Sequence, residues 1–162
     1  MSEAKPFIIT DNDRCFMRMA CDLACENVRC GGGPCGAVIV KDGEVIAAAG
    51  NTVTLDKDPT AHAEVNAIRR ACSSLNDHKL DGCVIYCSSE PCSMCLSAFY
   101  WAGVSRIYYS NTAADAQHIN FNDDFIQKEI QKPHLERAIP CICIEADAAL
   151  DSFRRTLDCK GG

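Results

Sequence analysis

The sequence predicts an α/β fold in which a mixed sheet of five strands carries helices on both faces. In the segment 11–28, apolar side chains recur every three or four positions, which is typical of an amphipathic helix. Asp42-Gly43 lies between two apolar runs and predicts a two-residue hairpin turn. After this hairpin, strand-like and helix-like segments alternate, which favours a sheet covered on both sides. We expect a single domain over residues 1–162.

The expected elements follow one another without a linker, a repeat or a low-complexity tract that would divide the chain. Thr10 or Asp11 can cap the first helix and Thr60 the second, because their side-chain oxygens accept hydrogen bonds from free N–H groups of a first turn. Helices are expected at residues 11–28, 62–74, from 92 onward, near 124–130 and at 146–157; strands are expected at residues 36–40, 44–50, 84–87, 106–109 and 139–145.

Composition narrows the range of partners. Of the 162 residues, 48% are hydrophobic and 23% are charged, which is ordinary for a globular domain with its own core. The formal net charge is −6, and the cations are scattered, whereas a nucleic-acid-binding protein normally carries a basic stripe. No apolar stretch reaches the length of a membrane span. We therefore expect neither a nucleic acid nor a membrane as partner.

The chain contains thirteen cysteines, an unusually high number. If two of them bind a metal, an odd number remains, and the first ten residues lack the pattern of a secretory signal. Both observations favour reduced thiols and a cytoplasmic location. Cys21 and Cys25 stand one helical turn apart, but no partner at a recognisable spacing supports a second metal site.

The segment 59–95 carries the residues that point to chemistry. His62, Cys92 and Cys95 offer one imidazole and two thiols, and Glu64 follows the histidine by two positions. Zinc binds such nitrogen and sulfur ligands in a tetrahedron, with four protein ligands in structural sites and three plus water in catalytic ones. A structural clip needs a fourth ligand, and no second C-x-x-C or H-x-x-x-H is present. The spacing H-x-E followed by P-C-x-x-C is typical of zinc-dependent base deaminases.

Both groups of ligands fall where helices are expected to begin. Free N–H groups and the helix dipole favour negative charge there, which lowers the pKa of a thiol. Cys92 and Cys95 are three positions apart, so their sulfurs lie on one face of the first turn. A bound zinc lowers the pKa of its water, and Glu64 would act as general acid and base for a leaving amine.

Four stretches carry a resemblance to a known family. They read GGPCGAVIVKDG, DPTAHAEVNAIRRAC, SSEPCSMCLSAFYWA and FNDDFIQKEIQKP with its continuation to ERAIP. The chain resembles the cytidine-deaminase-like superfamily and, within it, the bacterial-type guanine deaminases. The resemblance implies a three-layer α/β/α fold, one zinc ion, a homodimer and a small purine substrate. It implies hydrolysis of guanine at C2 to xanthine and ammonia, with Glu64 passing protons through ring N3 to the amine.

The resemblance also implies roles around the substrate. Asn51 would hold the purine edge, Asp123 would be a second acid near the leaving amine, and Trp101 would line the pocket wall. Ala63 and Cys35 would also lie against the substrate. Judged by sequence context alone, Asn51 could simply end a strand, Asp123 could cap the following helix, and Trp101 could be a core aromatic.

The chain departs from the family at two points. Cys35 stands in GGPCG where the family usually has an aromatic residue. The family also tends to close the site with a carboxy-terminal segment that is exchanged between subunits and ends in aromatic residues, whereas residues 158–162 include none. Three alternatives stay open. The substrate could be guanosine or another aminopurine or aminoazine. It could be adenosine in tRNA, which the acidic charge disfavours, or the chain could be an inactive zinc-stabilised module, which Glu64 disfavours.

Overall fold

The computed structural model describes residues 7–119 and 121–160. The start of the amino-terminal stretch and the last two residues of the tail, both considered above, lie outside this part. The chain divides into two compact units, residues 1–123 and 124–162, which are described one at a time. The expectation of a single domain over residues 1–162 stays a prediction.

The first unit alternates helices and strands after an initial hairpin, as the sequence predicts. Its elements are α1 (Asp11–Arg29), β1 (Gly33–Lys41), β2 (Glu44–Asn51), α2 (Val53–Asp56), α3 (Ala63–Leu75), β3 (Cys83–Ser89), α4 (Ser93–Ala102), β4 (Arg106–Asn111) and α5 (Ala113–Gln117). The sequence did not predict the short helices α2 and α5, because four or five residues are too few to show a helical period.

Local signals explain how the first elements begin and turn. Thr10 caps α1 in a reciprocal capping box: its Oγ1 accepts a hydrogen bond from the Asp13 backbone N–H, and the Asp13 side chain accepts one from the Thr10 N–H. Asp42 and Gly43 both have positive φ, 50° and 80°, as the predicted tight hairpin between β1 and β2 requires.

The sheet is mixed, with strand order β2-β1-β3-β4. β1 is antiparallel to both β2 and β3, whereas β3 and β4 are parallel and are joined by α4. The carboxyl ends of β2 and β3 and the start of β1 therefore lie at the same edge of the sheet. α4 begins just beyond β3. α3 follows β2 after the short helix α2, and the Thr52 N–H donates to the Ala61 carbonyl oxygen at 2.9 Å, so both helix N-termini lie at this edge.

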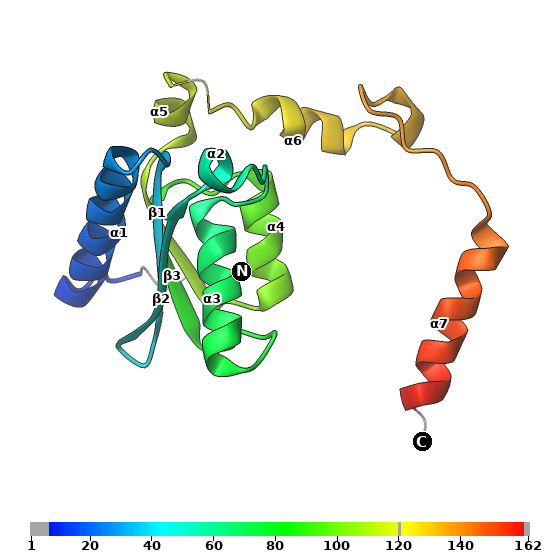
Figure 1. The fold of residues 1–162 in the computed structure, drawn as a ribbon, viewed down its shortest axis with the longest axis horizontal. Helices are drawn as coiled ribbons and strands as arrows, with labels where there is room; N and C mark the ends of the chain where they lie inside the picture. Colours follow the sequence, from blue (N-terminus) through cyan, green and yellow to red (C-terminus); the bar gives the residue numbers. More distant parts are fainter. Residues whose placement is uncertain (1–6, 120, 161–162) are drawn as a thin grey trace, which may run out of the picture. The chain divides into compact units, whose positions relative to one another are not determined.

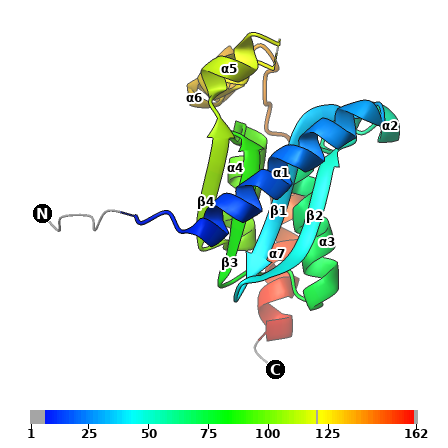
Figure 2. The ribbon, with the colours of Figure 1, turned by 90° about the vertical axis from the view of Figure 1, so that its left-hand side faces the viewer.

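Helices cover both faces of this sheet, so the first unit has three layers. α1 lies on one face, and α3 and α4 lie on the other (Figure 1 and Figure 2). The core on the α1 side contains Ala20, Val38, Val40 and Tyr86. The larger core, on the α3 and α4 side, includes Ile39, Ala67, Leu80, Ile85 and Phe99. This second core anchors the two helices whose first turns carry the site.

The prediction of a fifth strand at residues 139–145 is wrong, and the sheet has four strands in the described part of the chain. Alternating apolar residues are present there, but Ile139, Ile142 and Ile144 are 83%, 72% and 79% exposed. A strand needs a neighbour to accept and donate its backbone hydrogen bonds. The segment belongs to the second unit, in whose described residues no strand is found.

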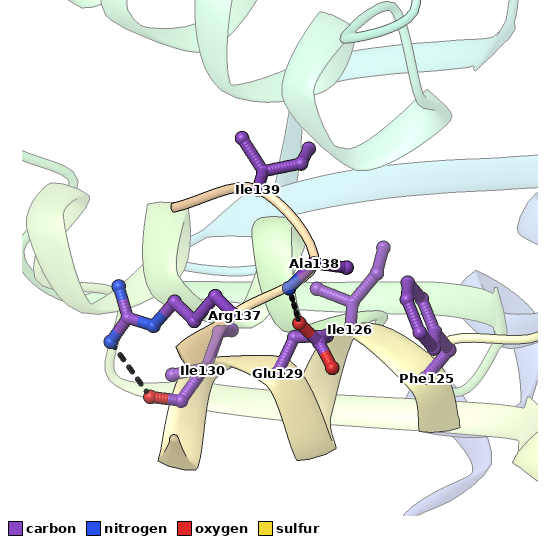
Figure 3. Close-up of a pocket in the computed structure, with 7 residues that line it drawn as sticks. All are labelled: Phe125, Ile126, Glu129, Ile130, Arg137, Ala138 and Ile139. Atoms are coloured by element: carbon purple, nitrogen blue, oxygen red, sulfur yellow. Dashed lines mark hydrogen bonds between the residues drawn. The ribbon is translucent and has the colours of Figure 1, made fainter. Parts of the chain in front are cut away.

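The second unit contains α6 (Asp124–Gln131), the short 3-10 helix η1 (His134–Glu136) and α7 (Ala146–Lys160). Hydrogen bonds fold the chain back after α6: Ala138 N–H donates to Glu129 Oε2 at 2.6 Å, and Arg137 donates to the Ile130 carbonyl oxygen at 3.1 Å. Together with Phe125, Ile126 and Ile139, these residues line a pocket of about 180 Å³ (Figure 3). Its wall is apolar, with one carboxylate and one guanidinium.

Among the described helices, none combines the length and the apolar character that crossing a membrane requires.

Candidate metal centre and active site

Two helix N-termini bring the three predicted ligands together. His62 is the N-cap of α3, Cys92 is the N-cap of α4, and Cys95 lies in the first turn of α4. The Cys92 and Cys95 sulfurs lie 3.6 Å and 3.5 Å from His62 Nδ1, and all three ligand atoms lie within 4.8 Å of one another. In the described part of the chain, no other group of three such side chains is found.

These separations fit zinc. Zn–S bonds of about 2.3 Å and Zn–N bonds of about 2.0–2.1 Å in a tetrahedron place sulfur and nitrogen about 3.5 Å apart. One imidazole nitrogen and two sulfurs occupy three corners, which leaves the fourth for water, as in a catalytic site. Residues two apart on a regular helix do not face one another, but His62 is the N-cap of α3, with extended φ and ψ, and so precedes the regular helix that carries Glu64.

The electrostatics of the ligands suit a cation. Hydrogen bonds from Cys95 and then from His62 lower the pKa of Cys92 to about 4, so this thiol is ionised at neutral pH. The same Cys92 thiolate raises the pKa of Cys95, with burial adding to the effect, and raises the pKa of His62. One thiolate is therefore in place before a metal binds, and a bound cation would stabilise the second.

Glu64 is a buried carboxyl group beside the ligands. It lies in the first turn of α3 and is 5% exposed. Burial raises the pKa of Glu64, and the negative charge of Cys92 acts in the same direction. A carboxyl group whose pKa moves toward neutrality can both accept and return a proton, which is what a general acid and base must do. Ala63, which precedes it, is fully buried.

Asp123 meets the first turn of α4. Its Oδ2 accepts a hydrogen bond from the Ser93 backbone N–H and its Oδ1 accepts one from Ser93 Oγ, both at 2.7 Å. Ser93 lies between Cys92 and Cys95, so the Asp123 carboxylate accepts from a free N–H group at the start of α4, next to the metal ligands. The sequence did not reveal Ser93 as its partner, because the two residues are 30 positions apart.

Asn51 ends β2 and is 3% exposed. Its Oδ1 accepts a hydrogen bond from the Val53 backbone N–H at 3.1 Å. Asn66 on α3 donates to the Gly50 carbonyl oxygen at 3.1 Å and to the Ala61 carbonyl oxygen at 3.3 Å, which connects the end of β2 to the residue before His62. Asn66 also donates to Thr52 Oγ1 at 2.9 Å, and no local pattern in the sequence indicates these three contacts.

Cys35 lies at the start of β1 and is half-buried. Its thiol donates to Ser89 Oγ at 3.9 Å. Burial, with the negative charges of Glu64 and Cys92, raises the pKa of Cys35 to about 11. Its place against the substrate stays a prediction.

Trp101 lies far from the metal ligands of its own chain. It is in the last turn of α4, nine residues beyond Cys92, or about 13 Å along the helix at 1.5 Å per residue. Its side chain is 81% exposed, so it is not a core aromatic. Its role in a pocket wall stays a prediction.

Three zinc ligands, an open corner and a buried carboxylate describe a hydrolytic zinc enzyme, since a structural clip would close the fourth corner with protein. The family model for the cytidine and deoxycytidylate deaminase zinc-binding region matches residues 10–111. The chain belongs to this family of zinc-dependent deaminases.

Known relatives include guanine deaminases and tRNA-specific adenosine deaminases. The chain is 50% identical to the guanine deaminase of Bacillus subtilis over 144 residues, 88% of this chain and 92% of the relative. The crystal structure of a Bacillus subtilis guanine deaminase superposes with a TM-score of 0.88 and 47% identity, covering 93% of this chain and 95% of that one. A tRNA-specific adenosine deaminase of Aquifex aeolicus is 43% identical over 64% of this chain and 67% of the relative.

Proposed function

We propose that this protein hydrolyses guanine to xanthine and ammonia. The observation that carries the proposal is the three-ligand zinc centre with the buried Glu64 beside it. It is supported by the 50% identity to a guanine deaminase over 88% of this chain. The similarity to tRNA-specific adenosine deaminases covers less of the chain, and the net charge of −6 does not favour a polyanion. We infer a free purine as substrate.

The zinc ligands and Glu64 have different roles in the proposed reaction. His62, Cys92 and Cys95 hold the zinc ion, which when bound lowers the pKa of a water molecule toward neutrality. With zinc bound, Glu64 would accept one proton from the water that adds to C2 of the purine and pass it to ring N3. It would then accept the remaining hydroxyl proton as the C2 carbonyl forms and deliver it to the amine, which leaves as ammonia.

The remaining polar groups orient and protonate. Asn51 binds the purine edge through its side-chain amide, which is supported by its burial at the edge of the sheet where the ligands lie. Asp123 supplies a second acidic group close to the leaving amine. The two hydrogen bonds it accepts from Ser93 hold its carboxylate against the turn that carries both cysteine ligands.

A panel of substrates tests the proposal. Zinc-loaded protein is incubated with guanine, guanosine, adenine and cytidine, and the product is followed by ultraviolet absorbance and ammonia release. We expect guanine to be converted to xanthine with the highest kcat/KM. Faster conversion of guanosine or of any other member of the panel would overturn the assignment of substrate while leaving the class of enzyme intact.

Cys35 gives a sharper test of the pocket. An aromatic ring stacked on a base contributes about 1–3 kcal/mol in nucleic-acid complexes, and a thiol offers no ring face. We expect Cys35→Phe to lower KM for guanine about fivefold or more with little change in kcat, because stacking stabilises ground and transition states alike. Steady-state kinetics with guanine and guanosine measure this.

A matched control is Cys15→Phe, the same change at an exposed position on α1, which is expected to leave KM unaltered. If the small side chain instead makes room for a larger substrate, Cys35→Phe should exclude guanosine and spare guanine. An unchanged KM for every purine would show that Cys35 does not line the pocket.

We propose a homodimer that buries the outer face of α4. Leu96, Tyr100 and Trp101 are 41%, 80% and 81% exposed there, and an exposed apolar patch is typical of a protein interface. Sedimentation at micromolar concentration is expected to give twice the 17.6 kDa mass of the chain. Trp101→Glu should shift the protein toward monomer, whereas Met19→Glu on α1 should not; a wild-type monomer would refute the dimer.

We also infer a cytoplasmic location. It is supported by the cysteines, none of which forms a disulfide and six of which are exposed. In an oxidising compartment such a set would form disulfides. Titration of freshly purified protein with a thiol reagent should count thirteen reactive groups after denaturation and zinc removal, and a markedly lower count would contradict this location.

A further inference from the structure

Asn27, near the end of α1, joins the ends of two strands. Its side-chain Nδ2 donates to the Gly33 carbonyl oxygen and to the Asn51 carbonyl oxygen, each at 2.7 Å. The side chain is half-buried. Asn51 is the residue that the proposed function assigns to the purine edge, so Asn27 contacts the backbone of a substrate-binding residue.

Three glycines surround this amide closely. A Cβ at Gly32 or Gly50 would come within 3.0 Å of the Asn27 side chain, and a Cβ at Gly33 would come within 3.0 Å of the Asn51 side chain. Real Cβ atoms keep longer distances, so any side chain at these positions would displace one of the two asparagines. The absence of side chains at the three positions therefore allows Asn27 and Asn51 to pack against the backbone.

The hydrogen-bond ladder between β1 and β2 is interrupted beside Asn51, so a side-chain contact is needed to hold the two strands together there. Gly33 pairs with Asn51, but the next pair is Gly36 with Gly50, so two extra residues of β1 stand between the pairs. Such a bulge disrupts the ladder and bends the strand. Asn27 donates to one carbonyl on each strand of the pair beyond the bulge, and it thereby fixes the backbone of Asn51 where the ladder alone holds it weakly.

We propose that Asn27 is a positioning residue for purine binding, which acts by holding Asn51 in place. This inference rests on the proposed function, because it assigns Asn51 to the substrate. Asn27 itself need not touch the purine. Its side chain donates to the backbone of Asn51, while the Asn51 Oδ1 accepts from Val53 N–H, so backbone and side chain of Asn51 are restrained from two directions.

The first measurement compares Asn27→Ala and Asn27→Asp with wild type. Alanine removes both hydrogen bonds, and aspartate keeps the size but directs a carboxylate at two carbonyl oxygens. We expect both variants to retain zinc and to raise KM for guanine by about tenfold or more, with kcat changing less, since a small displacement of a binding group weakens binding throughout the reaction. Unaltered KM in both zinc-loaded variants would overturn the inference.

A double-mutant cycle separates positioning from general destabilisation. If Asn27 acts through Asn51, then Asn27→Ala should raise KM in the wild-type background but change it less than about twofold in the Asn51→Ala background. Additive effects would show that Asn27 acts elsewhere. The control is Tyr86→Phe, which removes a 2.6 Å hydrogen bond to Asp13 at the other end of α1 and is expected to lower Tm without altering KM.

A crystal structure of Asn27→Ala provides a readout that does not depend on activity. We expect the Asn51 side chain to leave its contact with Val53 N–H, or to be poorly ordered; an unchanged Asn51 would overturn the inference even if turnover falls. Turnover of the wild type separates a failure of this inference from a failure of the proposed function. A wild type that prefers another purine refutes guanine as substrate, and the same cycle then runs with that purine.

Discussion

Glu64→Gln is expected to abolish nearly all turnover while leaving the fold and the zinc in place. Glutamine has almost the same shape as glutamate but cannot exchange a proton, so the loss should appear in kcat and be about a thousandfold or more, within the range of general acid–base catalysis. Because a buried carboxylate costs free energy that a neutral amide does not, Tm should not fall. Steady-state kinetics, metal analysis and thermal melts measure kcat, zinc content and Tm.

Glu44→Gln supplies the matched control. It makes the same chemical change at an exposed position at the start of β2 and should keep wild-type kcat, KM and Tm. If Glu64→Gln turned over guanine at a near-normal rate while zinc stayed bound, another group would have to move the proton. Asp123 would then be the first candidate, since its carboxylate already contacts the turn that carries Cys92 and Cys95.

The double variant Cys92→Ser, Cys95→Ser is expected to lose both zinc and activity. Wild type should bind about one zinc per chain, since three ligands of this kind with water complete one tetrahedron. The double variant replaces two thiolates by hydroxyls, which are poor zinc ligands at neutral pH, and should retain less than about a tenth of that amount after dialysis. Plasma mass spectrometry of the dialysed protein gives the ratio directly.

Cys141→Ser, Cys143→Ser removes two thiols at a similar spacing from an exposed part of the second unit, and it should keep the full zinc content. A chelator should lower the Tm of wild type and of this control, because a ligand that binds only the folded state stabilises it. It should leave the Tm of Cys92→Ser, Cys95→Ser unchanged. Zinc retained at full stoichiometry in Cys92→Ser, Cys95→Ser would exclude the proposed ligand set.

Much of the first unit follows from local signals. The periodicity of residues 11–28, the capping threonine and the Asp42-Gly43 turn are each complete within a few neighbouring residues, and α1 and the β1–β2 hairpin form where they predict. The predicted strand at residues 139–145 had only alternation in its favour, and alternation cannot supply the hydrogen-bonding neighbour that a strand requires.

The sequence by itself determined the chemistry: one imidazole, two thiols and a carboxylate at a spacing that matches zinc deaminases, placed at helix starts where thiolates are favoured. Only the tertiary structure decided what surrounds that centre. Asp123 meets Ser93 from 30 positions away, and Asn27 meets Asn51 from 24. Such contacts depend on where the sheet and its helices pack, so no local pattern records them, whereas caps and turns are recorded in adjacent residues.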